Sequence, residues 1–517
     1  MRVQKLLLGS LVISAVLAVA HKLVAMTASL QSISNADSYD AIDAYIEKQM
    51  HRLHIPGVSL AIVEGDKIVH LRGFGKARPG GEAPTPQTPF FIGSLTKSFT
   101  ALAIMQLVQV GKIELNAPIQ RYLPWFRVTD PQASSETSAL APALRSGASV
   151  TVRHLLNQTS SMPGLLGMEN LGNFDSRPNA TERQARALST LKLTRPVGSS
   201  FEYSNVNYNL LGLIIETVSG ESYTDYVQPH IFDPLEMKHS YSSKGKAQRD
   251  NLAVGHCYWF GIPIPVPNLS IPLGSLPSGQ LIASAEDVAH YLIANLNDGR
   301  YKDAQILSPA GINEMHRPAA EINEMGMVLG HYGMGWMIQE TAKSRIVWHS
   351  GDVPDFGAFM ALVPEQKKGI VILFNANHAM MKMTYDEVGI SAAQLLAGQT
   401  PTPHQFDALP LAMRGLILIP ILQIIGVIAT LRQLRRWRLE PGSRPSRGRM
   451  WGRHILLPLI PNLSIALTLI PMLSKLRGFL MLFMPDYSLI ALVCGSFSLV
   501  WSFLRTGLIL RPMREKD

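Results

Sequence analysis

The chain has 517 residues, 47% of them hydrophobic, which suffices for one large domain with extra segments or for two to three ordinary domains. Its net charge of +9 would suit a nucleic-acid-binding protein, but the basic excess lies in the tail: 15 Lys and Arg face 4 Asp and Glu from Leu409 onward, against 32 and 34 before it. These basic residues flank apolar segments, and no basic face interleaved with aromatic residues accompanies them. The sequence therefore argues against nucleic acid as a partner.

The N-terminus has the pattern of a secretory signal. Arg2 and Lys5 precede an apolar stretch over residues 6–20, and the last three residues of that stretch, A-V-A, offer a small-x-small cleavage site. We predict a signal peptide over residues 1–26, with an uncleaved N-terminal anchor as the alternative. Either one would deliver the following residues across a membrane.

Residues 38–400 are predicted to form one α/β domain. Strand-like runs lie at both of its ends, at 57–63, 68–74, 335–339, 356–363 and 369–374. Helical patterns lie between them, at 94–110, 207–218 and 285–296. This order predicts an antiparallel sheet assembled from both chain ends, flanked by helices and carrying an inserted all-helical region. The Ser- and Ala-rich segment 132–149 is predicted to be an exposed loop.

The tail has the pattern of a membrane anchor. After a linker at 401–410, three apolar runs are predicted to be transmembrane helices, at 411–431, 455–473 and 485–504. The loop 432–454 contains eight arginines and one acid, and the last segment, 505–517, is also basic. Basic residues next to membrane spans face the cytoplasm. We therefore predict a multi-pass protein of the bacterial cell membrane, with 432–454 and 505–517 in the cytoplasm and the preceding domain outside it.

The first motif with catalytic potential is S-x-x-K, formed by Ser94 and Lys97 at the start of a helix that we expect to be amphipathic. A serine hydroxyl becomes a good nucleophile when a base takes its proton. Three-residue spacing on a helix places Lys97 on the same face as Ser94. A partly desolvated lysine near other cations has a lowered pKa and can act as that base. By itself the motif is equally compatible with a capping serine and a surface lysine.

Two further motifs are short and individually unspecific. Tyr203 and Asn205 form Y-x-N before an apolar helix, and a tyrosine beside a lysine ammonium can relay a proton from a lowered pKa. His349 and Gly351 form H-x-G after the strand-like run 345–348, where glycine would let a substrate backbone approach the strand edge. The structural alternatives are a helix-capping turn for the first motif and a surface histidine in a turn for the second.

In this order and spacing, the three motifs resemble those of the serine β-lactamase and penicillin-binding-protein superfamily, in particular its class C β-lactamase and DD-peptidase-like (esterase-like) branch. Two more segments are similar to that family. Residues 152–164, VRHLLNQTSSMPG, resemble its R-H-L-L-x-H-T-S-G-x-P segment, and residues 277–284, PSGQLIAS, resemble its P-x-G-x-L-x-S segment. The resemblance covers about residues 40–395 and implies the β-lactamase/transpeptidase-like α/β fold.

The resemblance also implies roles for individual residues. Ser94 would attack a carbonyl and form an acyl-enzyme that water then hydrolyses. Lys97 and Tyr203 would share the work of the general base, with Tyr203 protonating the leaving group, and Asn205 would orient the substrate. The oxyanion hole would consist of the backbone N–H groups of Ser94 and Asp352.

This chain departs from the family pattern at three positions. His349 stands where many β-lactamases have lysine, and an imidazole binds a substrate carboxylate less surely than an ammonium does. Gln158 stands where the family usually has histidine, and Ser161 where it has glycine. The first departure weakens the expectation of β-lactam hydrolysis, and the other two concern structural support.

The function predicted from these features is that of an extracytoplasmic serine hydrolase acting on amide or ester bonds of small peptides or other D-amino-acid-containing substrates, as a DD-peptidase, D-aminopeptidase or esterase would. The alternatives are a penicillin-binding receptor or sensor that is acylated without turnover, and a true β-lactamase acting on β-lactam-like substrates. No cofactor or metal is expected, because His154, His256 and His349 lack metal-ligand spacing. Three predicted spans exceed the need of an anchor, which motivates a lipidic substrate or an exporter as a partner.

Overall fold

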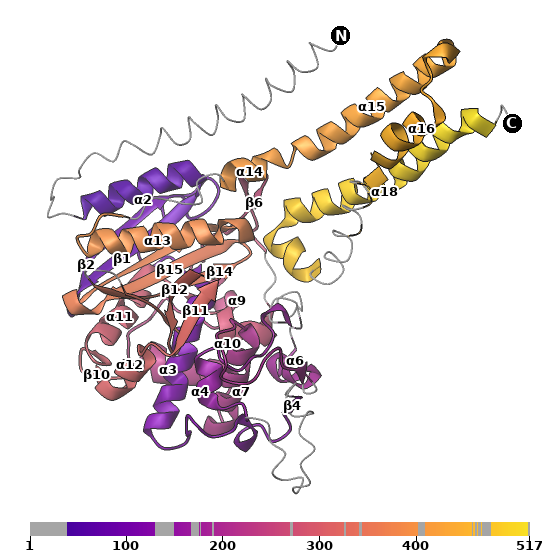
Figure 1. Cartoon of the computed structure of the whole chain (residues 1–517). Helices are drawn as coiled ribbons and strands as arrows, with labels where there is room; N and C mark the ends of the chain where they lie inside the picture. Colours follow the sequence, from indigo (N-terminus) through magenta and orange to yellow (C-terminus); the bar gives the residue numbers. More distant parts are fainter. Residues whose placement is uncertain are drawn as a thin grey trace, which may run out of the picture.

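The computed structural model describes residues 39–129, 149–166, 175, 177–188, 191–268, 272–324, 327–340, 344–401, 409–457, 459–460, 463, 467 and 477–514. Figure 1 shows a large α/β domain from which an arm of two long helices projects. The predicted signal peptide at 1–26 lies outside the described residues. So do all but one residue of the predicted loop 132–149 and most of the predicted span 455–473.

An eight-stranded antiparallel sheet forms the centre of the domain. In sheet order its strands are β11 (Ala320–Glu324), β12 (Met327–Tyr332), β13 (Met337–Glu340), β14 (Arg345–Val353), β15 (Phe356–Val363), β16 (Lys368–Phe374), β1 (Gly57–Glu64) and β2 (Lys67–Gly75). Strands from the two chain ends meet where β1 pairs with β16, with Ser59 opposite Leu373. The predicted assembly of the sheet from both ends is therefore confirmed.

Both faces of this sheet are covered by helices, which explains why β1 is buried along almost its whole length. Successive side chains of a strand point to opposite faces. Val58, Leu60 and Ile62 accordingly pack in the hydrophobic cluster beneath α2 (Asp40–Leu53) and α13 (Lys382–Leu396). Ala61 and Val63 belong to the other cluster, on the face where α11 (Ala285–Leu296) packs.

The helical region lies on the α11 side of the sheet (Figure 1). Its other helices are α3 (Thr96–Gln109), α4 (Val152–Leu156), α6 (Ala180–Ala187), α7 (Asn205–Ser219), α8 (Tyr223–Val227), α9 (Lys244–Arg249), α10 (Leu276–Gly279) and α12 (Pro309–Met315). The prediction that the helix after Ser94 is amphipathic is wrong. α3 is buried on all sides from Thr96 to Met105, because it packs against both α7 and α10.

A small sheet stands beside the large one, in the order β17 (Ala376–Asn377), β6 (His256–Trp259) and β7 (Ile262–Pro265). Three pairs of two-residue strands complete the domain: β3 (Phe90–Phe91) with β8 (Ile282–Ala283), β9 (Arg300–Tyr301) with β10 (Ala304–Gln305), and β4 (Val128–Thr129) with β5 (Leu191–Lys192). The β3–β8 pair holds the chain just before Ser94 next to the segment that follows α10.

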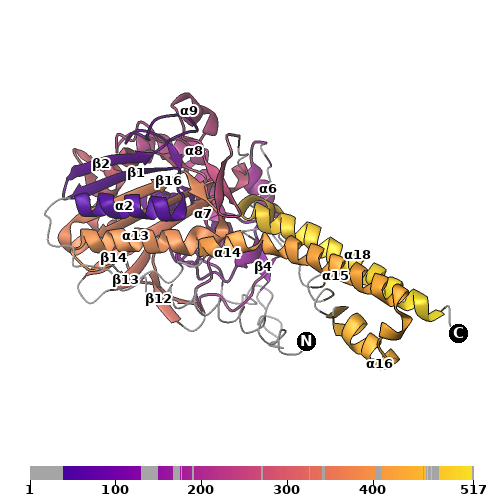
Figure 2. The same cartoon turned by 90° about the horizontal axis from the view of Figure 1, so that it is seen from above.

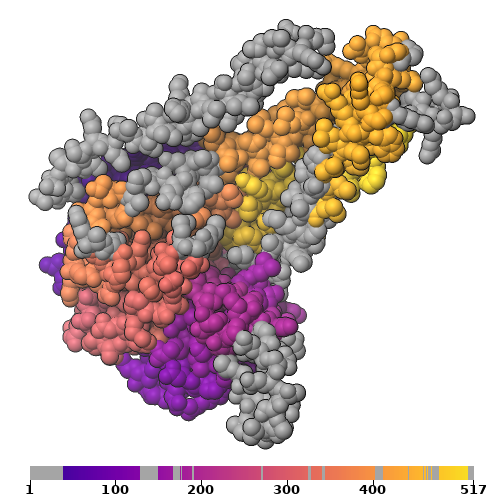
Figure 3. All heavy atoms as spheres, viewed as in Figure 1, coloured from indigo at the N-terminus to yellow at the C-terminus, as the bar shows by residue number. Residues whose placement is uncertain are grey.

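The arm consists of α14 (Leu409–Gly415), α15 (Leu418–Leu439), α16 (Arg447–Arg449) and α18 (Pro485–Arg514). Figure 2 shows α15 and α18 running side by side, and Figure 3 shows them projecting from the domain. Two helices of the described chain are long and apolar enough to cross a membrane, Leu411–Leu439 with 29 residues and Pro485–Leu510 with 26. α15 therefore continues into the predicted loop 432–454, and α18 into the predicted tail.

Candidate active site

Ser94 lies in a short 3-10 turn, Gly93–Leu95, that leads directly into α3. Gly93 has a φ of +53°, a backbone conformation that glycine adopts at no steric cost. This turn brings Ser94 to the place where α3, α7, α10 and β14 meet. The predicted nucleophile is thus held on rigid elements at the centre of the domain.

Lys97 is fully buried, and its Nζ has three partners. It lies 2.9 Å from Ser94 Oγ, 2.8 Å from Asn205 Oδ1 and 2.6 Å from the carbonyl oxygen of Ser278. Burial holds the pKa of Lys97 well below that of a free lysine, although the carboxylate of Asp352 opposes the shift. A neutral amine donates its two hydrogens to the amide and carbonyl oxygens, which leaves its lone pair for the hydroxyl of Ser94.

Tyr203 flanks the same pair from the start of α7. The centre of its ring lies 4.8 Å from Lys97 Nζ. Burial raises the pKa of Tyr203, and the nearby Ser94 side chain only partly opposes this. The expectation of a lowered tyrosine pKa is therefore wrong. Its physical premise, a neighbouring ammonium, is lost when Lys97 is neutral.

The segment that contains Tyr203 and Asn205 is supported by residues that the sequence did not identify as part of the site. Gln158 is buried, and its side-chain oxygen accepts hydrogen bonds from the Ser204 backbone at 3.0 Å and from Asn207 Nδ2 at 2.5 Å. Asn207 Oδ1 accepts a further bond, 2.6 Å long, from Ser160 Oγ. This network positions Tyr203 and Asn205, so the departure at Gln158 belongs to structural support, as expected.

His349 is 1% exposed and is not the surface histidine of the structural alternative. Its Nδ1 lies 2.6 Å from the carbonyl oxygen of Ser350 and its Nε2 lies 3.2 Å from Tyr332 Oη. Burial and the nearby Lys97 lower the pKa of His349 to about 3. The imidazole is therefore neutral, and it donates to the carbonyl and accepts from the phenol.

The H-x-G motif lies inside β14, not after the end of a strand as predicted. β13 pairs with β14 only as far as Trp348, whereas β15 pairs with β14 up to Val353. From His349 onward, the edge of β14 on the β13 side is consequently free of strand partners among the described residues. This is the edge that an extended substrate could join.

The structure gives Gly351 a packing role that the sequence did not predict. A Cβ at this position would lie 2.0 Å from the carbonyl oxygen of Ile92, and a Cβ on Gly93 would lie 2.3 Å from the backbone nitrogen of Asp352. The two glycines thus let the segment before Ser94 touch β14. This contact brings the backbone just before Ser94 next to that of Asp352.

The sequence did not single out Lys382, at the start of α13, which lies beside the same stretch of β14. Its Nζ is 2.6 Å from Asp386 Oδ2, 3.4 Å from Ser350 Oγ and 4.0 Å from Asp352 Oδ2. Burial raises the pKa of Asp352 to about 6, while Lys382 opposes the shift. No sequence motif surrounds Lys382, so its position beside the site becomes apparent only from the packing of α13 against β15.

The sequence profile of the family described as Beta-lactamase matches residues 42–395. The chain therefore belongs to this family, within the serine β-lactamase and penicillin-binding-protein superfamily, whose members are serine hydrolases. The described residues contain no group of three or more His, Cys, Asp or Glu side chains that could hold a metal ion.

Individual relatives and solved structures are similar to this chain over about two thirds of its length. Protein flp of Staphylococcus aureus (strain MW2) is 32% identical over 66% of this chain, and the match spans 64% of the length of that relative. Unguisins hydrolase ungD' of Aspergillus campestris is 27% identical over 66% of this chain and 63% of its own length. An octameric penicillin-binding protein homologue from Pyrococcus abyssi superposes with a TM-score of 0.60 at 29% identity, over 70% of this chain and 78% of that one. A class C β-lactamase shares the fold, with a TM-score of 0.54 at 21% identity, over 71% and 99%.

Proposed function

We propose that this protein is a membrane-bound serine hydrolase that forms an acyl-enzyme at Ser94 and acts on ester or amide bonds of small D-amino-acid-containing substrates. The observation that carries the proposal is the arrangement of Lys97. This side chain is fully buried, 2.9 Å from Ser94 Oγ, and has a depressed pKa. A buried neutral amine in this position can take the proton of the serine hydroxyl as it attacks.

In the proposed reaction, Ser94 Oγ bonds to the substrate carbonyl carbon while Lys97 Nζ takes the hydroxyl proton. The backbone N–H groups of Ser94 and Asp352 stabilise the negative charge that develops on the carbonyl oxygen. Tyr203 gives its phenolic proton to the leaving amine or alcohol and recovers a proton from Lys97. Asn205 holds Lys97 through Oδ1, so its Nδ2 is the group left to orient the substrate. Water then hydrolyses the acyl-enzyme.

The charges around the site favour some substrates over others. His349 is neutral, and the positive charge of Lys382 is balanced by Asp386 at 2.6 Å, with Asp352 as a further carboxylate. The third motif therefore offers a substrate carboxylate no unpaired cation. This balance favours esters and substrates with a free amine over carboxypeptidase substrates or β-lactams, whose carboxylates would approach Asp352.

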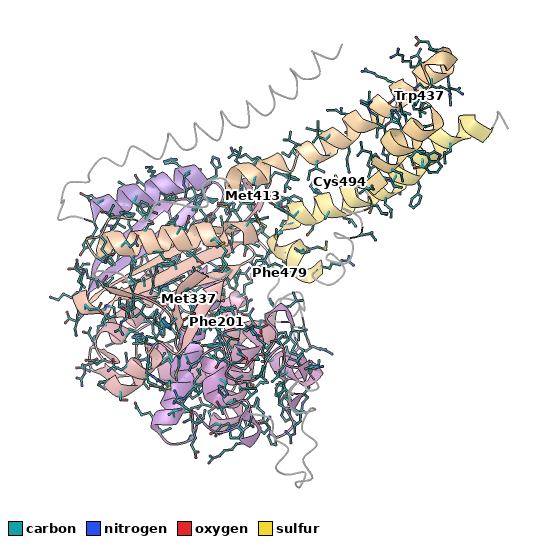
Figure 4. The ribbon with its side chains drawn as sticks, in the orientation of Figure 1. Phe201, Met337, Met413, Trp437, Phe479 and Cys494 are labelled. Carbon is teal, nitrogen blue, oxygen red and sulfur yellow. The ribbon has the colours of Figure 1, made fainter. Side chains whose placement is uncertain are left out.

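The arm supports a membrane location. The two apolar helices are mostly exposed, as lipid-facing helices are, and Gln423 on one donates to the carbonyl oxygen of Cys494 on the other at 2.9 Å. The arginine-rich segment 432–454, which includes Trp437, lies toward the end of the arm away from the domain (Figures 1 and 4), and Arg505 donates to the carbonyl oxygen of His454 in that segment. By the positive-inside tendency, that end is cytoplasmic and the domain is extracytoplasmic.

Intact-protein mass spectrometry with a fluorophosphonate probe and with benzylpenicillin tests the nucleophile. We expect the wild type to gain one adduct and Ser94→Ala to gain none. Ser98→Ala is the matched control, because Ser98 is a buried serine on the same helix whose Oγ donates to the Leu95 carbonyl oxygen instead. Adduct formation on Ser94→Ala would refute the assignment.

Turnover distinguishes the hydrolase from the two alternatives. We expect steady release of product from D-amino-acid esters and amides, and slower release from substrates that carry a carboxylate next to the scissile bond. A stable adduct with every substrate would instead indicate a receptor that is acylated without turnover. Rapid hydrolysis of a chromogenic cephalosporin with no hydrolysis of the esters would indicate a β-lactamase.

A further inference from the structure

A long part of the catalytic domain lacks charged residues. Between Asp250 and Glu286 the chain contains no Asp, Glu, Lys or Arg, although such residues make up 16% of the whole sequence. The segment includes the hairpin formed by β6 and β7, whose sequence from Trp259 to Pro267 is WFGIPIPVP. An uncharged segment of this length is expected in a buried core or next to a membrane.

The hairpin is not buried in the core. Ile262 is 60% exposed and Ile264 is 43% exposed, on the strand that forms the edge of the β17–β6–β7 sheet. Edge strands that face water usually carry charged residues, which this one lacks. Pro263 and Pro265 have no N–H to donate, so a further strand from a protein partner pairs poorly with this edge.

The hairpin is fixed at the start of α18. The buried carboxylate of Asp486, in the first turn of that helix, accepts a hydrogen bond from the backbone N–H of Phe260 at 2.8 Å and lies 2.9 Å from His378 Nε2. Cys257 Sγ contacts the carbonyl oxygen of Leu482, 3.8 Å away. α18 contacts β6, and Figure 4 shows Phe479 where the arm meets the domain.

We propose that the β6–β7 hairpin is a membrane-contact surface, with Trp259, Phe260, Ile262 and Ile264 in the boundary between lipid headgroups and acyl chains. This inference rests on the membrane location proposed above. Tryptophan and other apolar side chains are favoured at that depth, and the hairpin has no charge to keep it in water. If the neighbouring apolar helices cross the membrane, they place the hairpin beside the lipid surface, and this surface is the partner that we assign to it.

This surface is close to the catalytic machinery. Asn377, next to His378 in the chain, donates from Nδ2 to Asp352 Oδ1 at 3.2 Å and to the Val353 carbonyl oxygen at 2.8 Å. The wall that carries the oxyanion residue is therefore attached to the membrane-contacting hairpin.

The test places a fluorescent label on the hairpin of the full chain. Ile262→Cys and, separately, Ile264→Cys are labelled with an NBD maleimide and reconstituted in liposomes of phosphatidylethanolamine and phosphatidylglycerol containing doxyl-labelled lipid. Both native cysteines are buried, so the labelled wild type serves as the blank. Val110→Cys is the matched control, because Val110 is an equally exposed apolar residue, at 65%, directly after α3.

We expect blue-shifted emission and at least twofold stronger quenching by doxyl lipid at positions 262 and 264 than at 110, with weaker quenching by iodide. Equal quenching at the three positions would overturn the inference. A blue shift that depends on protein concentration and not on lipid would also overturn it, because it would indicate that a second copy of the chain covers the hairpin. Carbonate extraction separates the two proposals. A chain that leaves the liposomes contradicts the membrane location, whereas a retained chain with an unquenched hairpin contradicts only the membrane contact.

Discussion

In the proposed mechanism, Lys97 and Tyr203 share the proton-transfer work. Lys97 is surrounded by Ser94, Asn205, the Ser278 carbonyl and the ring of Tyr203, and the carboxylate of Asp352 is the charge that affects its pKa. Burial disfavours both an ammonium and a phenolate, so it lowers the pKa of Lys97 and raises the pKa of Tyr203. These opposite shifts suit the roles that we propose, with Lys97 as the base and Tyr203 as the acid.

The first prediction concerns pH. The negative charge of Asp352 raises the pKa of Lys97, so removing that charge in Asp352→Asn lowers the pKa further. The base form of Lys97 exists above its pKa, and the acid limb of kcat/KM should therefore move to lower pH in the variant. The measurement is the pH profile for an ester substrate. Asp386→Asn, which removes the carboxylate paired with Lys382, should move the limb less, and a shift to higher pH in Asp352→Asn would contradict Lys97 as the base.

The second prediction concerns the leaving group. Tyr203→Phe removes the phenolic proton that we assign to the departing amine. Amide hydrolysis should fall by about 10²–10⁴-fold, the usual contribution of a positioned acid. Esters of nitrophenol should lose much less, because that leaving group departs without a proton. Parallel kcat/KM values for one acyl group on both leaving groups provide the measurement, and an equal loss on the two would argue for a merely structural role of Tyr203.

At the scale of elements, the site depends on the contact between the turn at Gly93–Leu95 and β14. The carbonyl of Ile92 occupies the place where a side chain at Gly351 would begin. Ser94 and Asp352 are more than 250 residues apart in the chain, so tertiary contacts such as this one set their relative position. An oxyanion hole made of two backbone N–H groups needs that position to be accurate.

The third prediction is that Gly351→Ala separates the two elements. A Cβ at 2.0 Å from a backbone oxygen cannot be accommodated without moving one segment. A displacement of about 1 Å costs about 10²-fold in rate, so we expect kcat to fall by at least that factor. The measurement is kcat together with far-UV circular dichroism to verify the fold. Gly245→Ala in α9 is the control and should retain activity, because a Cβ there meets nothing closer than 3.9 Å. Full activity of Gly351→Ala would show that the contact is unimportant.

At the scale of the whole molecule, the arm and the catalytic domain are joined by buried polar contacts. His378 and Asp486 are both fully buried and 2.9 Å apart, although they belong to the domain and to the arm, respectively. Met413 of α14 is also buried, within the hydrophobic cluster of α2 and α13 (Figure 4). The domain and the base of the arm therefore share one core, which gives the catalytic domain a defined orientation relative to the apolar helices.

The fourth prediction tests this connection. Asp486→Ala removes the partner of His378 Nε2 and of the Phe260 N–H, both of them buried, which should cost about 3 kcal/mol of folding free energy. The measurement is the apparent Tm of the full chain in detergent. Glu440→Ala is the control, because its ion pair with Arg436 is exposed and such pairs contribute little. Equal Tm changes in the two variants would contradict a structural connection through Asp486.

The sequence by itself determined the elements whose signals are local. The helix at 285–296 and the strand at 356–363 have the bounds predicted from their patterns, because hydrophobic periodicity and flanking turns act within a few residues. The spacing of Ser94 and Lys97 likewise placed both on one face of a helical segment. The order of the three motifs indicated the family, whereas the arginine-rich loop did not mark the end of the first apolar helix, which continues to Leu439.

Tertiary structure decided everything that depends on burial and on contacts between distant segments. α3 looked amphipathic, but neighbours on all sides bury it, and burial also lowers the pKa of Lys97 and raises the pKa of Tyr203. Lys382 and the Asp486–His378 pair had no local signal, since their partners lie on other elements. Interactions between charges, desolvation and close backbone contacts depend on the distances between atoms, and folding sets these distances.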